Sequence, residues 1–585
     1  MDHTFTVGVA TSMQQFVGYW GSGDPNAQAQ LLKKILPQAE KNQNWHICSQ
    51  EPRDGILAAL CASGLPYKMQ TSTTSPDVWV QAVEYSLTLA RDAFGRVTLY
   101  WLKLEEVIWF ASRLQLLLPL VESPTVDLAA LYGYSCFSYI PTPLTPVAGI
   151  WALAAGIKQT WKLDGSGKIL PPHSHNLINW QENSHQIADE KVAIAQLQTH
   201  LKAAVERQIS DLGDETVGVM LSGGLDSSVV AALLVQAGVK VRAYTLNLGD
   251  KSVPEFPYAQ KVAQWLKIPL IEVDATPKQI KPALIATIRA LDLPFGDGVS
   301  VPLFLLHQAA SRDTRIIFNG EGGDQLFAGW TNKPLIAASI YQGEHPEGAT
   351  SFTNQYLRTF HRLYGYEKQV FEPRVYAEIQ QLQAQDWLDD ALEFSSNPSL
   401  LHQLRRASLM LKGAQNIQPR ATNLAFAHSL QVRSPFCDLP LAQWTFQLSG
   451  ELCLQGACEK YILKRAVESW LPPEIVWRQK RGMGVPLTPW CLKDFWHSLG
   501  MWLNPGILKA EGRWQPNIAA RIAKGDLGGM LTGRRIGEII WLLIVWQLWR
   551  VHVLGESAEN FSWNHPFLIP YPVWKLARYI NWHEG

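Results

Sequence analysis

The chain has 585 residues, of which 47% are hydrophobic and 17% charged, and its formal net charge is zero. This length exceeds what one hydrophobic core supports, so two or more domains are expected, and the composition excludes a disordered chain. Balanced charge provides no bulk attraction to nucleic acid or to an anionic membrane, so neither is expected as a partner.

The region up to about residue 180 has the pattern of short strands. Two apolar runs, Val97–Leu102 and Val107–Ala111, are separated by turn residues. The prolines of 141–146 exclude a helix interior or a central strand there. The polar stretch 173–189 is predicted to be a linker, and a helix over 190–210 is predicted to follow it.

Strands and helices then alternate. Single helices between strands predict a parallel sheet that binds its ligands at the carboxyl ends of the strands. Beyond Glu321 the pattern is mostly helical and ends in an apolar helix over 534–553, which is too short to span a membrane. The predicted strands are 217–221, 241–246, 269–273 and 315–318, and the predicted helices are 227–237, 255–266 and 301–311.

The most informative segment follows the first of these strands. Gly223 and Gly224 allow a tight turn close to an anion, and the next helix offers unpaired N–H groups and the positive end of its dipole. Three hydroxyls and one carboxylate accompany the glycines, and the carboxylate would repel phosphate unless Mg²⁺ lay between them. We therefore predict a phosphate site formed by Ser222, Gly223, Gly224, Asp226, Ser227 and Ser228. The loop lacks the Gly-Lys-Ser/Thr of a Walker A motif.

A second glycine-rich turn, 319–329, follows the strand 315–318 and carries Glu321 and Asp324. In a parallel sheet it can face the first loop, so Asp226 and Asp324 could share a Mg²⁺ ion bound to ATP. A third segment, 477–486, carries Lys480 among basic and glycine residues, and this lysine could neutralise charge that grows on the α-phosphate. Lys460 and Arg465 are weaker candidates of the same kind.

Seven cysteines are scattered along the chain without a zinc-binding pattern, and residues 1–4 resemble no signal peptide. We expect reduced thiols and a cytoplasmic protein.

With these motifs assembled, the chain resembles the asparagine synthetase family along most of its length. Ser-Gly-Gly-Leu-Asp-Ser-Ser resembles that family's pyrophosphatase loop, and Gly-Glu-Gly-Gly-Asp-Gln-Leu-Phe-Ala-Gly its second phosphate and metal loop. Residues 427–438 resemble its helical-domain signature, and 471–482 resemble the segment with its catalytic lysine. Residues 90–96 and 141–156 resemble signatures of its glutaminase domain.

The resemblance implies an α/β protein. Residues 1–180 would form an α+β sandwich of the N-terminal-nucleophile type, related to class II glutaminases. Residues 190–585 would form a doubly wound, parallel-sheet ATP pyrophosphatase (PP-loop) domain with a largely helical C-terminal part. A homodimer, or a partner that carries a precursor peptide or its leader, is possible on this resemblance.

The resemblance also implies roles for single residues. Ser222, Gly224, Asp226 and Ser227 would hold the pyrophosphate. Mg²⁺ would bind Asp226 and Asp324, Lys480 would stabilise the transition state, and Glu321 would lie nearest the acceptor amine. Residues lining the nucleotide pocket would be Leu221, Leu246 and Gly320, the first two against adenine.

Three departures from the family pattern stand out. Glutamine-hydrolysing members have a cysteine nucleophile directly after the initiator methionine, whereas this chain has Asp2 there and its first cysteine is Cys48. Because a carboxylate does not replace a thiolate in attack on an amide, we predict a degenerate, inactive glutaminase domain. Asn319 stands where a serine or threonine is usual, and Gln325 where a glutamate is.

Three functions remain open. The chain could join aspartate and free ammonia into asparagine, with ATP and Mg²⁺ and through an acyl-adenylate. It could instead close a ring within one substrate, as the β-lactam synthetases and lasso-peptide cyclases do, which also lack the cysteine. The third possibility is a non-catalytic paralogue that binds a nucleotide. The presence of all the predicted acids and the lysine argues against it. The glutamate of the second loop and the 427–438 signature favour the first function.

Overall fold

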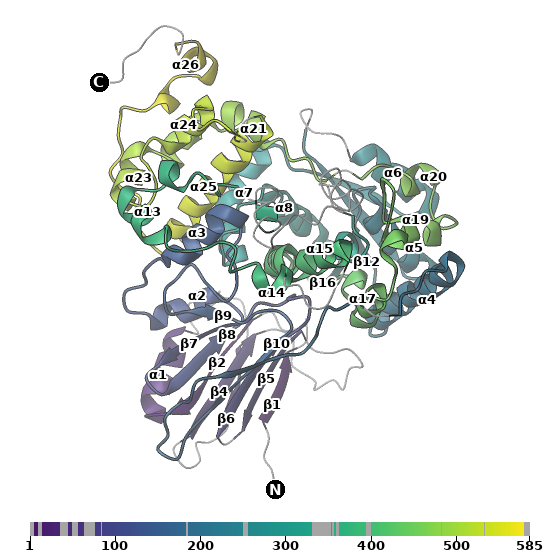
Figure 1. Ribbon diagram of the computed structural model, residues 1–585, viewed down its shortest axis with the longest axis horizontal. Coiled ribbons are helices and arrows are strands. Elements are labelled where there is room, and N and C mark those ends of the chain that lie inside the picture. The colour runs from purple at the N-terminus through teal and green to yellow at the C-terminus, as the bar shows by residue number, and fades with distance from the viewer. Residues whose placement is uncertain are drawn as a thin grey trace.

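The computed structural model describes most of the chain between residues 5 and 577. The residues left out inside this range are 10–14, 36–44, 50–55, 64–76, 84, 183–184, 250–254, 330–352, 354–355, 358–361, 393–398, 481, 530 and 532. Figure 1 shows three parts: a strand-rich N-terminal part, a part around the β12 sheet, and a helical part around α25.

The N-terminal part is a sandwich of two antiparallel sheets, with strand orders β1-β5-β6-β10-β11 and β3-β4-β2-β8-β7-β9. Apolar side chains such as Trp20, Val80, Leu89 and Trp161 fill the space between the sheets. The strands are β1 Phe5–Val9, β2 Gln15–Ser22, β3 Trp45–Ser49, β4 Ile56–Ser63, β5 Val78–Val83, β6 Ser86–Arg91, β7 Tyr100–Leu104, β8 Val107–Ala111, β9 Trp151–Ala152, β10 Ile157–Lys162 and β11 His173–Asn176, and the helices are α1 Pro25–Ile35, α2 Leu114–Leu117, η2 Leu118–Leu120 and α3 Leu128–Phe137.

Two sequence predictions need correction here. The strand predicted at 97–102 begins only at Tyr100 and runs to Leu104, where it forms a hairpin with β8. The predicted linker 173–189 begins inside the sandwich, because its first residues form β11 and pair with β10 despite their polar side chains. An exposed edge strand needs no apolar face, which is why this strand has no hydrophobic signal.

The middle part contains the predicted parallel sheet, with strand order β14-β13-β12-β15-β16. Helices α5 and α6 pack on one face and α7 and α8 on the other, so the sheet is doubly wound. The elements are α4 Glu190–Ile209, β12 Val217–Met220, α5 Leu225–Gln236, β13 Val241–Asn247, α6 Phe256–Leu266, β14 Leu270–Asp274, α7 Pro277–Leu291, α8 Ser300–Ala310, β15 Ile316–Phe318, α9 Gly323–Leu326 and β16 Gln431–Arg433.

The sequence patterns identified four of these five strands to within a residue or so at each end. They missed β16, a three-residue edge strand within the 427–438 signature that was expected in the helical part. They also missed α7, whose sequence contains Pro282 five residues after its first residue.

The C-terminal part is mainly helical, as predicted, and packs around α25, whose residues 539–546 are buried on all sides. No described helix is long and apolar enough to cross a membrane. The elements are α12 Glu367–Val370, α13 Pro373–Ile379, α14 Asp389–Leu392, α15 Leu400–Ser408, η3 Leu409–Ile417, α16 Gln418–Phe426, η4 Pro435–Cys437, α17 Leu439–Thr445, α18 Gly450–Cys453, β17 Leu454–Gln455, β18 Cys458–Glu459, α19 Tyr461–Val467, α20 Pro473–Val476, α21 Leu487–Pro489, η5 Trp490–Asp494, α22 Trp496–Trp502, α23 Pro505–Glu511, α24 Ile518–Lys524, α25 Arg534–His552, η6 Pro566–Leu568 and α26 Tyr571–Ala577.

One fully buried carboxylate, Asp292, joins the sandwich to the rest of the molecule. It lies just beyond α7 and accepts hydrogen bonds from the backbone N–H groups of Leu114 and Gln115, the latter at 3.0 Å. These N–H groups open α2 of the sandwich and have no partner within that helix. The Arg113 guanidinium lies 3.7 Å from the same carboxylate. Asp292 therefore caps a helix of the neighbouring domain.

We predict that Asp292→Ala lowers the free energy of the first unfolding transition by about 3 kcal/mol, because it leaves the N–H groups of Leu114 and Gln115 without an acceptor and removes the carboxylate beside Arg113. Urea denaturation measures this change. Asp214→Ala is the matched control, since Asp214 is 97% exposed and pairs only with Lys240 on the surface. Equal stability of the two variants would contradict a domain-joining role for Asp292.

Candidate functional site

The turn between β12 and α5 lies at the carboxyl edge of the sheet and has the geometry of an anion site. Gly223 has a φ of +67°, and a Cβ there would lie 2.5 Å from the backbone of Tyr258, so the turn requires glycine. Gly224 is the N-cap of α5 and no side chain caps this helix end. The first turn of α5 thus presents N–H groups to an incoming ligand.

The hydroxyls of the three serines in this loop have different hydrogen-bond partners. The Ser222 and Ser227 hydroxyls lie 3.2 Å apart, and Ser222 Oγ accepts from Gly224 N, so both line the inside of the turn. Ser228 is fully buried and its hydroxyl donates to the Gly224 carbonyl at 2.7 Å. The structure therefore turns Ser228 into the helix, where it shapes the loop rather than facing a ligand.

The second glycine-rich turn lies against the first, as the parallel pairing of β12 and β15 requires. A Cβ at Gly320 would lie 2.6 Å from Ser227 N, and one at Gly323 would lie 2.5 Å from Asp226 Oδ1. Only glycines allow this approach. It brings Asp226 of α5 and Asp324 of α9 to one place, although they are far apart in the sequence.

Two lysines from the C-terminal part reach these carboxylates. Lys460 Nζ bonds Asp226 Oδ2 and lies 2.5 Å from Asp324 Oδ1. Lys480 Nζ bonds both oxygens of Asp324, at 2.8 and 2.7 Å. The Lys460 side chain is 2% exposed and that of Lys480 is 23% exposed, so only Lys480 is accessible to a bound substrate.

Burial and charge act on these groups in opposite directions. Burial raises the pKa of Asp226, and the nearby Lys460 opposes this. Burial also raises the pKa of Asp324, but Lys460 and Lys480 lower it more strongly and hold it well below its usual value. Burial would lower the pKa of Lys480, but Asp324 and Asp226 raise it, so this lysine stays charged.

Glu321 belongs to a separate charged pair at the edge of the site. Its side chain is 34% exposed, and the Arg420 guanidinium of α16 lies 3.7 Å away. Arg420 is itself fixed by Asp297 at 2.6 Å and by Asn416 at 3.0 Å. Burial raises the pKa of Glu321, which Arg420 partly opposes, and a raised pKa suits a carboxylate that accepts a proton from an amine.

The predicted adenine contacts also lie at this edge. Leu221 directly follows β12, and Leu246 lies near the end of β13, but their side chains are 1% and 4% exposed and belong to the core. Contact of these side chains with adenine stays a prediction.

The acidic pair has the chemistry that Mg²⁺ requires. Carboxylate oxygens are its preferred protein ligands, and Asp226 Oδ1 is buried without a hydrogen-bond partner. Asp226 and Asp324, beside the N–H groups of α5, therefore fit a magnesium ion bound to phosphate. Among the described residues no group of three or more His, Cys, Asp or Glu could hold a metal without such a ligand.

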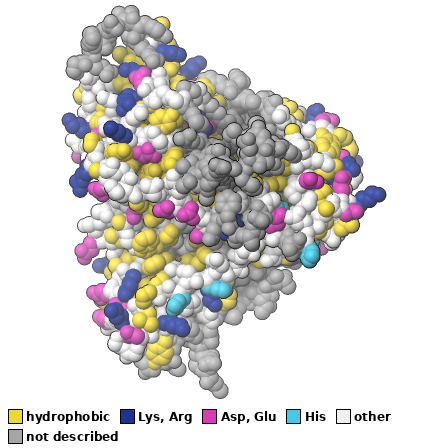
Figure 2. Space-filling view, viewed as in Figure 1, with side chains coloured by type: hydrophobic (Ala, Val, Ile, Leu, Met, Phe, Trp, Pro, Cys, Tyr) yellow, Lys and Arg dark blue, Asp and Glu magenta, His cyan; other side chains and the backbone are white. Residues whose placement is uncertain are grey.

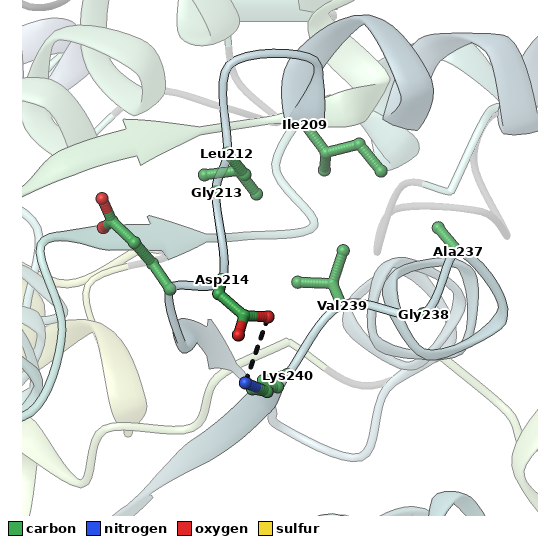
Figure 3. A pocket seen from close by; sticks show the side chains of 9 residues that line it. Ile209, Leu212, Gly213, Asp214, Ala237, Gly238, Val239 and Lys240 are labelled. Carbon is green, nitrogen blue, oxygen red and sulfur yellow. Dashed lines mark ion pairs between the residues drawn. The ribbon is translucent and has the colours of Figure 1, made fainter.

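Two hollows of the described surface are lined by none of these residues, and one of them lies among Glu511, Arg513 and Arg550 of the C-terminal part. The hollow of Figure 3 lies at the opposite end of the sheet, where Asp214 and Lys240 precede β12 and β13 and form a surface ion pair. On the face shown in Figure 2, acidic and basic side chains are interspersed.

Comparison with known proteins agrees with this geometry. The sequence profile of asparagine synthase matches residues 196–550, which is more than half of the chain. The chain belongs to the asparagine synthase family.

Its relatives are distant. Asparagine synthetase [glutamine-hydrolyzing] 1 of Bacillus subtilis is 23% identical over 68% of this chain and 66% of its own length. A putative asparagine synthetase [glutamine-hydrolyzing] of Mycobacterium tuberculosis is 24% identical over 81% of this chain and 76% of its own length. Among solved structures, an NH3-dependent NAD synthetase from Campylobacter jejuni matches 36% of this chain and 100% of its own at 13% identity, with a TM-score of 0.19, too low for a functional argument.

Two residues of this synthase-family site were undervalued or missed in the sequence. The sequence favours Lys480 over Lys460, although among the described residues it is the Lys460 ammonium that contacts both acids. Arg420 lies in α16, a buried helix of mixed polar and apolar residues in which no motif was identified. The signal in the sequence for Lys460 is its place between a short hairpin and an apolar helix, where both neighbouring elements restrict the backbone of a charged residue.

We predict that Lys460→Met lowers stability by about 3–5 kcal/mol at pH 7, since Asp226 and Asp324 lose the cation that they share. Adding Asp226→Asn to this variant should recover part of the loss by removing one of the two charges. Thermal and urea unfolding measure both changes.

Lys261→Met is the control, because Lys261 is half exposed and pairs with Glu474 on the surface. The account fails if Lys460→Met is as stable as this control, or if the double variant is less stable than Lys460→Met alone.

Proposed function

We propose that this chain activates a carboxylate with ATP as an acyl-adenylate and transfers the acyl group to an amine, with aspartate and free ammonia as the leading substrates. The observation that carries the proposal is the convergence of Asp226, Asp324 and Lys480 in front of the uncapped end of α5. Membership of a family of ATP-dependent carbon–nitrogen ligases supports it.

In this reaction a carboxylate oxygen attacks the α-phosphorus and the bond to the bridging oxygen of pyrophosphate breaks. The N–H groups of the first turn of α5 and the hydroxyls of Ser222 and Ser227 would hold the departing pyrophosphate. Lys480, charged and accessible, would neutralise the charge that develops on the α-phosphate. Mg²⁺ held by Asp226 and Asp324 would supply further neutralisation of phosphate charge.

The second half-reaction forms the C–N bond. The amine attacks the acyl carbon, AMP leaves with one former carboxylate oxygen, and the amine loses a proton. Glu321 would orient the amine and accept that proton, and its raised pKa suits this role.

Glutamine hydrolysis is not part of the proposed activity. Position 2, where the family's nucleophile would stand, lies outside the described residues, as do the side chains of Cys48 and Cys61. The remaining cysteine of the sandwich, Cys136, is fully buried, and burial raises the pKa of its thiol far above the usual value. Such a thiol is unsuited to nucleophilic attack.

We predict that pyrophosphate release from Mg²⁺-ATP, assayed with aspartate and ammonium, falls by about 100-fold or more in Lys480→Met and in Asp226→Asn. Lys240→Met, an exposed lysine at the other end of the sheet, should retain the wild-type rate.

A rate unchanged in Lys480→Met would refute the adenylation proposal. If aspartate is inactive but a peptide with a free carboxylate and amine supports release, the reaction is ring closure, and asparagine formation is excluded. Absence of release with every carboxylate tested, together with ATP binding, would establish a non-catalytic paralogue.

We predict that glutamine incubated with the full chain and ATP yields no glutamate above a protein-free blank, because Asp2 stands in place of the family's cysteine nucleophile and the Cys136 thiol is buried. Glutamate is measured enzymatically or by mass spectrometry. Glutamate production that follows protein concentration and disappears with a thiol-alkylating reagent would falsify this part of the proposal.

A further inference from the structure

The segment that carries Lys480 has little regular structure of its own. It joins α20, which ends at Val476, to α21, which starts at Leu487. A lysine on such a segment can occupy many positions, because backbone freedom is lost only through contacts. The contacts of residues 477–480 therefore decide where the ammonium lies.

Arg478 provides the contact to the phosphate loop. Its guanidinium carbon lies 3.4 Å from the centroid of the Tyr258 ring on α6, and its Nη1 donates to the Gly223 carbonyl at 3.4 Å. Gly223 is itself pressed against the backbone of Tyr258. Arg478 thus touches two elements that are already fixed to each other.

A second contact holds the segment two residues later. The Lys480 backbone N–H donates to Glu459 Oε1 at 3.0 Å, and Glu459 is 4% exposed. Between these two contacts Gln479 is exposed, and beyond them the Lys480 side chain extends to Asp324. Trp477 Nε1 also donates to Glu468 Oε1 at 3.1 Å. The segment is therefore attached through the side chains of Trp477 and Arg478 and the backbone of Lys480, and of these three Arg478 contacts the phosphate loop.

We propose that Arg478 is a positioning residue that clamps the Lys480 segment onto the phosphate loop through Tyr258 and Gly223, and this rests on the proposed function of Lys480. A guanidinium is suited to this role because it is planar, so it stacks on a ring while its edge donates a hydrogen bond, which an ammonium cannot do. One face of the Arg478 group is covered by Tyr258 and one of its donors is used by the Gly223 carbonyl. In this proposal the group acts through Lys480 and not as a ligand of phosphate.

The test compares Arg478→Ala, Arg478→Lys and Tyr258→Leu with the control Arg374→Ala, whose arginine is 92% exposed on α13. Pyrophosphate release should show kcat reduced by about 10- to 100-fold in the three variants, with KM for ATP within about twofold of wild type, since a misplaced lysine affects the transition state more than ATP binding. Arg478→Ala should cause no further loss in a Lys480→Met background.

Hydrogen exchange of the ATP-free protein supplies a readout that does not depend on activity. Exchange over residues 477–486 should rise in Arg478→Ala and in Tyr258→Leu, and stay at the wild-type level in Arg374→Ala. If wild-type protein releases no pyrophosphate, the proposed function fails, and hydrogen exchange still decides whether the clamp exists.

Two results would overturn the inference. One is unchanged exchange over 477–486 in Arg478→Ala. The other is a KM for ATP raised by tenfold or more with kcat retained, which would make Arg478 a phosphate ligand.

Discussion

The candidate site depends on one buried arrangement of charge, in which the ammonium of Lys460 lies against both Asp226 and Asp324. Two carboxylates held this close in a buried place repel each other and resist ionisation. The positive charge of the shared lysine offsets this repulsion, and Lys480 adds a second positive charge beside Asp324. The two acids are thereby held against one ammonium, and in the proposed function they would share one metal ion bound to a polyphosphate.

The rest of the fold brings these groups together. The parallel pairing of β12 and β15 places the two acidic loops side by side, and glycines at 320 and 323 let them approach to backbone contact. The lysines come from segments more than 130 residues further along the chain. Helix α19, which follows Lys460, packs against α4, and the segment of Lys480 contacts Tyr258 and Gly223 through Arg478. Asp292 then joins the sandwich to this assembly by capping α2. The candidate site and the contact between the domains are thus built in the same way, from a buried carboxylate and donors of a distant segment.

Much of this could be predicted from local sequence. The strand, glycine turn and helix of 217–236 have distinct periodicities and a turn that only small residues allow, so their form could be predicted directly. The phosphate ligand of this turn stays a prediction. The Lys460 and Arg420 contacts could not be read, because each depends on packing between segments far apart in the chain. Strand β16 could not be predicted for a different reason, because three residues are too few to show the alternation of a strand. Ser228, which turns into the helix, shows that a motif does not reveal which way each hydroxyl points.

The central claim is that ATP is split between its α- and β-phosphates by a substrate carboxylate. Mass spectrometry of the nucleotide product tests it most directly, after turnover of a carboxylate labelled with ¹⁸O. The account predicts AMP that carries one ¹⁸O atom, formed in equal amount with unlabelled pyrophosphate. Formation of ADP, or label in inorganic phosphate, would show attack at the γ-phosphate and contradict it.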